Sequence, residues 1–242
     1  MSDEPCILVT GATGVVGVAV VRDLLRRGYR VIASYAHSES VAVALHDEGS
    51  PGCLETVQAD LTHPDDVARL VGELGAHKIP VAGFVHAAAL VDHTPMADLE
   101  PARFGEVLSV NVTAAYALAR SLAGFGALES VVLLSSIGSE FADLGSVAYT
   151  ASKGAVDGLT RALASELAPV RVNAVSPGVV RSHRTALDPI LSGPEFTQRI
   201  PLKDLVDPAA LADVIAFLLG AGARSMTGQI LRVDGGHSLR LL

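Results

Sequence analysis

Short apolar runs of strand length alternate with amphipathic stretches along the chain. The runs are bounded by glycine, proline or small polar residues. They occupy residues 6–10, 30–35, 54–60, 81–90, 130–136, 171–178 and 228–236. Seven such runs alternate with six helical stretches, without a repeat, a linker or a break in composition. This pattern predicts a single domain over residues 1–242, with a Rossmann-type α/β fold: a doubly wound, seven-stranded parallel sheet with helices on both faces.

Helical periodicity accounts for most of the intervals between the apolar runs. The predicted helices lie at 18–28, 38–48, from 64 onward, 101–124, from the region of 149 to about 168, and 208–219. The stretch 179–208 lacks this periodicity and holds four prolines, at 189, 194, 201 and 208. We expect this stretch to form an irregular loop or lid.

Composition and charge narrow the class of protein. Of the 242 residues, 50% are hydrophobic and 18% charged, which predicts a large core and little disorder. The net charge of −8 and the lack of a basic run argue against nucleic-acid binding. No apolar stretch reaches the ~18 residues of a membrane span, and the acidic N-terminus does not resemble a signal peptide. Two cysteines are too few for a disulfide framework, so a cytoplasmic protein is expected.

A glycine-rich turn follows the first apolar run. Residues 11–17 read GATGVVG and stand between residues 6–10 and the first predicted helix. Glycines at such a turn let the backbone approach a pyrophosphate, which the helix N-terminus then stabilises through its N–H groups and dipole. The order of strand, turn and helix favours this dinucleotide-binding interpretation over a tight turn without a ligand.

The end of the second apolar run bears on the choice of dinucleotide. An acid there would bind the ribose hydroxyls of NAD. After Tyr35, however, the chain reads Ala36-His37-Ser38 and has no acid before Glu39. This favours NADP, although no arginine is present to bind its 2′-phosphate. His37 is equally consistent with a plain surface residue.

Small or polar residues also end other predicted strands. Asp60 could contact adenine or be only a turn residue, and the stretch 86–89, HAAA, would let a nicotinamide ribose approach the backbone. Because ligands of doubly wound sheets bind beyond the carboxyl ends of the strands, this coincidence supports a dinucleotide site without reference to any family. No metal is expected, since no second His or Cys stands at metal-ligand spacing from His86.

Tyr149 and Lys153 carry the candidate chemistry. Their spacing on a helix places both side chains on one face, within reach of one bound molecule. A neighbouring ammonium lowers the pKa of a phenol from ~10 toward the range of general acid–base catalysis. Ser136, at the end of the fifth run, could hold a carbonyl oxygen against the phenol. The alternative is a buried tyrosine and a solvated lysine on an ordinary amphipathic helix.

Asn111 is the remaining polar residue of interest. It lies inside the predicted helix 101–124, where asparagine costs stability relative to alanine. A reason for its presence is therefore expected, unless it is a mild defect.

With these residues in view, the chain resembles the short-chain dehydrogenase/reductase superfamily over nearly its full length. The matching motifs are Thr10-Gly11 with Gly17, Asp60, Asn111, Ser136, Tyr149, Lys153, Pro177-Gly178, and Thr227-Gly228 through Asp234-Gly235-Gly236. Stretches 199–219 and 227–238 are similar to 3-oxoacyl-[acyl-carrier-protein] reductases and discrete polyketide ketoreductases.

The resemblance implies a role for each residue of the catalytic set. Tyr149 would donate a proton to the carbonyl oxygen. Lys153 would lower the pKa of that phenol and bind the nicotinamide ribose. Ser136 would hold the substrate oxygen, and Asn111 would keep a water in the proton relay. Hydride would come from NADPH, and the residues implied to bind it are Gly11, Thr13, Gly14, Val16, Gly17, Tyr35, His37, Asp60, Leu61, His86, Ala87, Ala88, Tyr149, Lys153, Pro177, Gly178 and Val180.

The implied reaction is NADPH-dependent reduction of a ketone to a secondary alcohol, in a 3-oxoacyl thioester of CoA or of an acyl carrier protein. Family members are usually homodimers or homotetramers packed through the helices that carry Asn111 and Tyr149. An NAD(P)-dependent dehydrogenase of a small secondary alcohol is the alternative enzyme. A non-catalytic dinucleotide sensor is a third possibility, and the intact four-residue set argues against it.

Three features depart from the family pattern. Gly14 stands one residue before the usual glycine of the turn, and stretch 86–89 replaces the usual Asn-Asn-Ala-Gly. Few basic residues stand in the stretches where carrier-protein reductases place them, 124–130 and 166–171. An acidic carrier protein would meet little positive charge there, so a different natural substrate is also consistent with the sequence.

Overall fold

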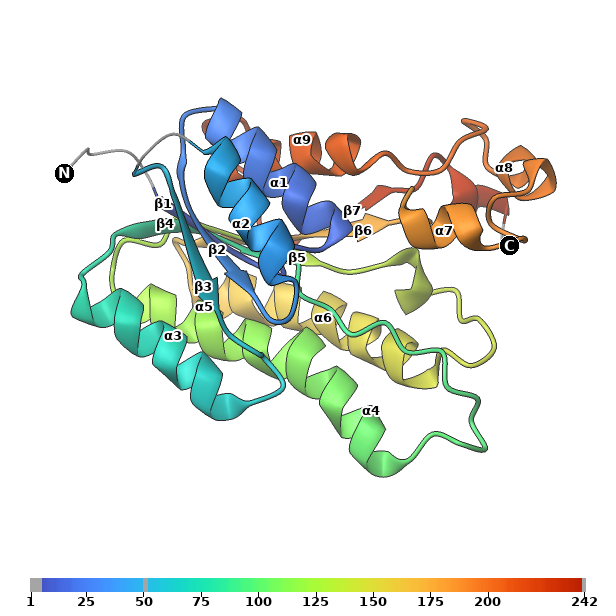
Figure 1. The fold of residues 1–242 in the computed structure, drawn as a ribbon, viewed down its shortest axis with the longest axis horizontal. Coiled ribbons are helices and arrows are strands. Elements are labelled where there is room, and N and C mark those ends of the chain that lie inside the picture. The colour runs from blue at the N-terminus through green and yellow to red at the C-terminus, as the bar shows by residue number, and fades with distance from the viewer. Residues whose placement is uncertain (1–5, 50–51, 241–242) are drawn as a thin grey trace.

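The computed structural model describes residues 6–49 and 52–240, which fold around one parallel sheet (Figure 1). The seven strands follow the order β3-β2-β1-β4-β5-β6-β7, and every neighbouring pair is parallel. They are β1 Cys6–Thr10, β2 Arg30–Tyr35, β3 Leu54–Gln58, β4 Val81–His86, β5 Ser130–Leu134, β6 Arg171–Pro177 and β7 Ile230–Val233. The strand order reverses between β1 and β4, which is the topological switch point of a doubly wound sheet. The predicted fold class is confirmed.

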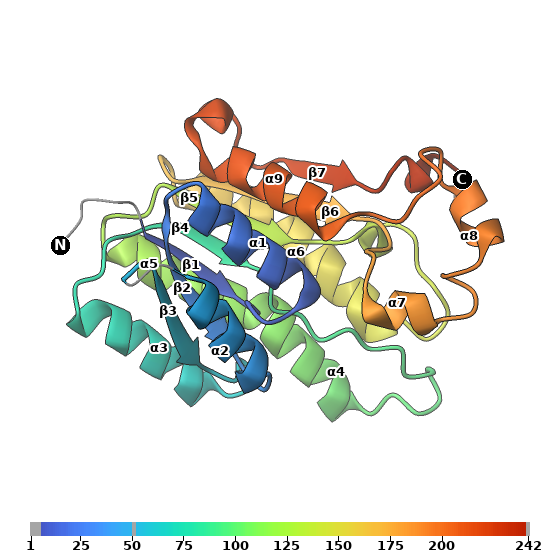
Figure 2. The same ribbon diagram turned by 45° about the horizontal axis from the view of Figure 1, so that its top comes forward.

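Helices cover both faces of this sheet. α1, α2 and α9 lie on one face, and α3, α4, α5 and α6 lie on the other (Figures 1 and 2). Their bounds are α1 Val15–Arg26, α2 Glu39–Glu48, α3 Pro64–Ala76, α4 Pro101–Leu108, α5 Ala114–Gly124, α6 Val147–Glu166 and α9 Pro208–Leu219. Within the described ranges, no helix combines the length and the apolar character needed to cross a membrane.

The central strands are buried on both faces, which explains why they stand out as apolar runs. All five residues of β1 and all five of β5 are buried. The edge strand β3 has one buried residue, Leu54, and the other edge strand, β7, has none. Leu24 and Ile215 belong to the core on the α1 and α9 face, and Leu70 and Leu118 belong to the core on the opposite face. Parallel sheets require this cover on both sides.

Several strands end earlier than the sequence predicts. β3 ends at Gln58, β4 at His86 and β5 at Leu134, whereas the corresponding apolar runs continue to 60, 90 and 136. The next residues still make single ladder bonds, such as the one from the Ala87 N–H to the Thr10 carbonyl, before the chain turns toward the next helix. Asp60, Ala87, Ala88 and Ser136 therefore lie in loops just beyond the carboxyl edge of the sheet.

Stretch 179–208 was predicted to be irregular, but it contains two short helices, so the prediction is wrong at those residues. These are α7 His183–Leu187 and α8 Pro194–Arg199. Ser182 and Thr185 form a capping box at the start of α7, and Pro194 stands in the first turn of α8. Helices of one or two turns are too short to show apolar periodicity, although their start signals are present in the sequence. The role of this stretch as a lid stays a prediction.

Candidate active site

The carboxyl ends of β1, β4 and β5 lie side by side. In the strand register Thr10 pairs with His86, and His86 pairs with Leu133. Gly11 and Ser136 come just after β1 and β5, and α6 packs against β5 and β6. The loops that carry the predicted site residues thus meet one face of α6 at the switch point of the sheet.

Tyr149 lies half-buried in the first turn of α6. Burial raises the pKa of its phenol, while a hydrogen bond with the Ser136 hydroxyl and the positive charge of Arg184 act in the opposite direction. The net effect is a pKa above the ordinary value, so the phenol is protonated at neutral pH, as a proton donor must be. Arg184 belongs to α7, and no sequence pattern pointed to it.

Lys153 is buried, not solvated, with 2% of its surface exposed. Its Nζ donates a hydrogen bond of 2.6 Å to the Leu134 carbonyl and lies 5.5 Å from the centre of the Tyr149 ring. The ammonium therefore lies over the ring of Tyr149, and the lowering of the phenol pKa by Lys153 stays a prediction. Burial lowers the pKa of Lys153 to about 8, against the opposing effect of Asp157.

Asn111 lies in a π-helical turn, Ser109–Thr113, that interrupts the predicted helix 101–124. Its side chain is buried and accepts a bond from the Leu90 N–H at 2.8 Å. The Asn111 amide donates to the Leu90 carbonyl at 3.1 Å and to the Ser152 hydroxyl at 2.8 Å. Ser152 in turn donates to the Tyr149 carbonyl. Asn111 thus joins the loop after β4 to the helix that carries Tyr149. These bonds explain why an asparagine stands at this position despite its low helix propensity.

The side chain of His86 has a structural role, and the predicted cofactor contact of this stretch through its backbone stays a prediction. The imidazole is 2% exposed, and its Nε2 lies 3.0 Å from the Val110 carbonyl. A carbonyl can only accept, so Nε2 carries the proton and Nδ1 accepts from the Thr10 hydroxyl at 2.9 Å. Both ring nitrogens are therefore occupied, and the side chain cannot bind a ligand. Within residues 6–49 and 52–240, no group of three or more His, Cys, Asp or Glu is placed to hold a metal ion.

Acidification is expected to destabilise the fold through His86. Burial, and to a lesser extent the charge of Lys153, lower the pKa of His86 from 6.5 to about 3. Between these values the unfolded chain binds a proton that the folded protein does not. The contribution of His86 to stability is therefore full above about pH 6.5 and is lost as the pH falls toward 3. Urea unfolding between about pH 4 and 7 should show a steeper loss of free energy in wild type than in His86→Gln; parallel slopes would contradict this assignment.

The glycine turn is built from close backbone contacts. A Cβ on Gly11, whose φ is +65°, would lie 2.5 Å from the Cα of Ala88. A Cβ on Gly17 would lie 2.1 Å from the Gly11 carbonyl oxygen. α1 begins at Val15, earlier than predicted, and no side chain caps its first turn. Its free N–H groups, beside a turn without bulky side chains at Gly11 and Gly14, fit the pyrophosphate of a dinucleotide.

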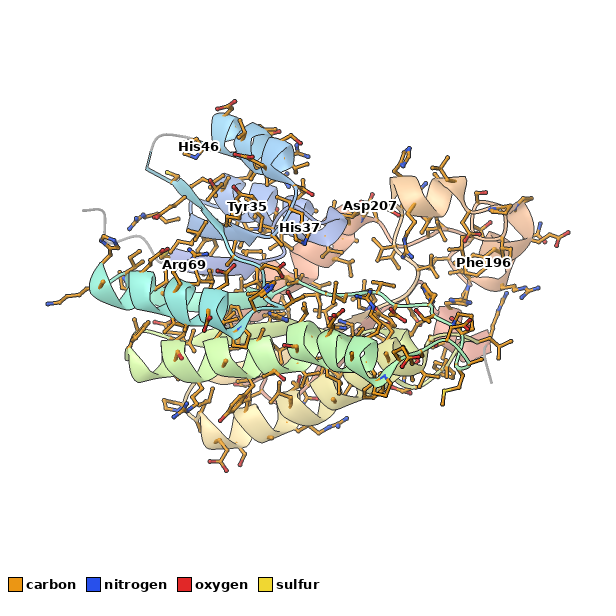
Figure 3. All side chains as sticks on the ribbon, turned by 60° about the horizontal axis from the view of Figure 1, so that its bottom comes forward. Tyr35, His37, His46, Arg69, Phe196 and Asp207 are labelled. Atoms are coloured by element: carbon orange, nitrogen blue, oxygen red, sulfur yellow. The ribbon has the colours of Figure 1, made fainter. Side chains whose placement is uncertain are left out.

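Asp60 lies between two histidines just beyond β3. Its Oδ2 is 3.7 Å from Nε2 of His37 and 3.6 Å from Nδ1 of His63. Its Oδ1 accepts bonds from the N–H and the hydroxyl of Thr62. Burial opposes ionisation, but these bonds and the histidines outweigh it and lower the pKa of Asp60. Tyr35 and His37 lie close together at the end of β2 (Figure 3), so the predicted adenosine-side residues are brought together, and His63 joins them unpredicted.

Three further residues that were predicted to contact the cofactor lie in packed positions. Leu61 is 5% exposed and packs in the hydrophobic core, so its side chain is not available to a ligand. Gly178 follows β6 and lies so close to β7 that a Cβ there would be 2.9 Å from Cα of Asp234. Val180 forms an isolated bridge with Val206. The loop after β6 is therefore fixed to the C-terminal part of the chain.

Comparisons with known proteins agree with this arrangement. A family model described as Enoyl-(Acyl carrier protein) reductase matches residues 11–238. The uncharacterized oxidoreductase YmfI of Bacillus subtilis is 32% identical over 95% of this chain and 97% of its own length. An acetoacetyl-CoA reductase of Allochromatium vinosum is 31% identical, over 95% and 96%. A solved structure of a putative NAD(P)-dependent gluconate 5-dehydrogenase from Beutenbergia cavernae, with bound NADP, is 34% identical with a TM-score of 0.88 and covers 97% of each chain.

Proposed function

Because the chain belongs to the short-chain dehydrogenase/reductase superfamily and is an NAD(P)-dependent oxidoreductase, we propose that it reduces a ketone to a secondary alcohol with NADPH. The proposed substrate is a 3-oxoacyl thioester, bound to CoA or to a carrier protein. The observation that carries the proposal is the joint placement of Ser136, Tyr149, Lys153 and Asn111 around the first turns of α6. When bound, the nicotinamide supplies the hydride.

The protein contributes the proton and the orientation of the reacting carbonyl. The Tyr149 phenol, kept protonated by burial, donates its proton to the carbonyl oxygen as negative charge develops there. The Ser136 hydroxyl, which lies near that phenol, holds the same oxygen. Lys153 stabilises the resulting phenolate through its positive charge. Asn111 fixes the backbone of Tyr149 through Ser152.

The thioester assignment rests on the relatives and on the side chains of the stretch after β6. The acetoacetyl-CoA reductase acts on the smallest substrate of this class. Leu187 and Ile190 are 70% and 73% exposed, on the same segment as Arg184, whose charge reaches Tyr149. An acyl chain entering toward Tyr149 would cover these apolar side chains.

We expect NADPH to be preferred over NADH by about 10-fold or more in kcat/KM with acetoacetyl-CoA. The end of β2 carries no acid that would bind the ribose hydroxyls of NAD, and the imidazoles of His37 and His63, on either side of Asp60, are available to donate to a 2′-phosphate. One charge-assisted hydrogen bond of ~1.5–3 kcal/mol corresponds to a factor of this size. Oxidation of the two cofactors is followed in parallel by absorbance. Equal use of both, or preference for NADH, would contradict the cofactor assignment but not the reaction.

A second candidate is a dehydrogenase that oxidises a small secondary alcohol. The gluconate 5-dehydrogenase likeness favours it. Turnover of acetoacetyl-CoA with either cofactor would support the ketoreductase. Its absence, together with reduction of NAD(P)+ by a polyol or hydroxy acid, would support the alternative.

We further propose that the enzyme is a homodimer or homotetramer packed through α4, α5 and α6. Tyr116, in the first turn of α5, and Phe125, just after its last residue, are 46% and 42% exposed. Large aromatic side chains in this position would be covered by a second copy. An acyl carrier protein remains a candidate partner for the same enzyme, although the net charge of −8 would repel an acidic carrier.

A further inference from the structure

The last residue of β5 and the two residues after it each act on a different residue of α6. The Leu134 carbonyl accepts from Nζ of Lys153 at 2.6 Å. The Ser135 hydroxyl donates to Oδ1 of Asp157 at 2.5 Å. The Ser136 hydroxyl lies near the phenol of Tyr149 and acts to lower its pKa. The first and third contacts belong to the proposed chemistry, and the second does not.

Asp157 is therefore a buried carboxylate without an assigned task. It is 8% exposed, and its partner Ser135 is 3% exposed. Burying a charged group is costly unless it is paired or serves a function. Asp157 follows Lys153 by one helical turn, so both side chains lie on the same face of α6.

We propose that Asp157, oriented by Ser135, is a positioning residue that keeps Lys153 protonated at the active site. An ammonium enclosed at 2% exposure, with a carbonyl as its hydrogen-bond acceptor, tends to lose its proton. An opposite charge one turn away counteracts this tendency. The Ser135 bond holds that charge on the β5 side of the helix, where Lys153 lies.

The other groups around Lys153 do not provide this charge. Tyr149, on the same helix, is a neutral phenol at neutral pH. His86 approaches from β4, and its pKa of about 3 keeps it neutral as well. Asp157 is the carboxylate whose charge raises the pKa of Lys153.

Two arginines also lie near Asp157 and could compete for it. Arg232 of β7 is influenced by the charge of Asp157, but its side chain pairs with Glu140. Arg161 donates to the backbone carbonyl of Asp157, not to the carboxylate. The bond that fixes the carboxylate is thus the one from Ser135.

The direct test is the titration of Lys153 in the full chain without cofactor. The sequence has three lysines, and Lys78 and Lys203 are exposed, so ε-13C-lysine labelling gives three NMR signals that Lys78→Arg and Lys203→Arg assign. Asp157→Asn should shift the Lys153 midpoint down by ~1 pH unit, since an opposite charge typically moves a pKa by 1–3 units. Asp157→Glu should restore most of the shift. An unchanged midpoint in folded Asp157→Asn would overturn the proposal.

The matched control is Asp23→Asn. Asp23 is also buried, at 5% exposure, and lies on α1, where it pairs with Arg26 and Arg27. The Asp23→Asn variant should be less stable than wild type, and its Lys153 signal should not move. If Asp157→Asn does not fold, Asp157→Ser keeps a hydrogen-bonding group without the charge and should show the same downward shift; no shift there also overturns the proposal.

The consequence for turnover rests on the proposed function, whereas the titration does not. With a less basic Lys153, the protonated form is lost at lower pH, so the alkaline limb of kcat/KM should move down by the same ~1 unit. A shifted NMR midpoint without activity on any carbonyl would retain the role of Asp157 and refute only the proposed reaction. A shifted midpoint with an unmoved alkaline limb would show that Lys153 does not limit turnover and would overturn the catalytic part of the inference.

Discussion

Replacing Tyr149 with phenylalanine is expected to lower kcat/KM for acetoacetyl-CoA by about 10²–10⁴-fold, the usual contribution of a general acid. The phenol is the proposed donor to the oxygen that Ser136 would hold, and burial keeps it protonated. The ring itself stays in Tyr149→Phe, so its packing beside Lys153 is retained. NADPH oxidation under kcat/KM conditions gives the rate, and NADPH fluorescence gives the binding constant separately.

The control is Tyr29→Phe, which removes a hydroxyl from a tyrosine that packs on the α1 and α9 side of the sheet. Tyr29→Phe should leave turnover within a factor of about two, because Tyr29 stands just before β2, at the opposite end of the strands from the candidate site. If Tyr149→Phe keeps half of the wild-type rate, Tyr149 is not the general acid. If it loses NADPH binding as strongly as turnover, the loss reports on the cofactor site and not on proton transfer.

Gly17→Ala is expected to abolish stable folding or to cost at least ~3 kcal/mol, the upper end for overpacked sites. Its Cβ would lie 2.1 Å from the Gly11 carbonyl oxygen and 2.8 Å from the Cα of Ala12. Both contacts are to backbone, which cannot rotate away, so α1 would have to separate from the turn. Against a total of ~5–15 kcal/mol for a domain, such a loss should be plain in urea unfolding.

Gly72→Ala is the matched control for this substitution. Gly72 is also a helical glycine, in α3, and a Cβ there would meet nothing within 4 Å. It should stabilise the protein by ~0.5–1 kcal/mol, because glycine is a poor helix former relative to alanine. Opposite signs for the two variants are the expected result, and equal effects would mean that the close approach at Gly17 relaxes freely.

The fold could be predicted because its strongest signals come from its most buried parts. β1, β2 and α9 lie where the apolar runs and Pro208 place them. The predicted ends of the strands were less accurate, because small and apolar residues such as 87–90 continue the sequence pattern after the backbone has left the sheet. The short helices α7 and α8 escaped detection because one turn cannot show a period.

The candidate site was predictable in its residues but not in its electrostatics. Spacing brought Tyr149 and Lys153 to one face, but it could not reveal that Nζ bonds to the Leu134 carbonyl. His86 was included among the predicted cofactor residues because it stands at the end of a strand, whereas its two ring bonds make its side chain part of the scaffold. Arg184 comes from a distant stretch of chain, and Asp157, on the same helix as Tyr149, is fixed by a bond from Ser135 that no motif announces. Only the folded arrangement shows their effects.

The π turn at Ser109–Thr113 restricts which changes in chain length the protein can tolerate. A π turn holds one residue more than a regular helical turn, so deleting a residue there would restore regular geometry. Because the π turn already absorbs this extra residue, the helix after the deletion would keep its phase, and the face of α5 that contains Leu118 and Leu122 would still meet the core. The cost would fall on the turn itself, which carries the Val110 carbonyl that bonds to His86 and the Asn111 amide that bonds to Ser152. A deletion within α5, in contrast, would rotate everything after it by ~100° about the helix axis, since an α-helix has 3.6 residues per turn.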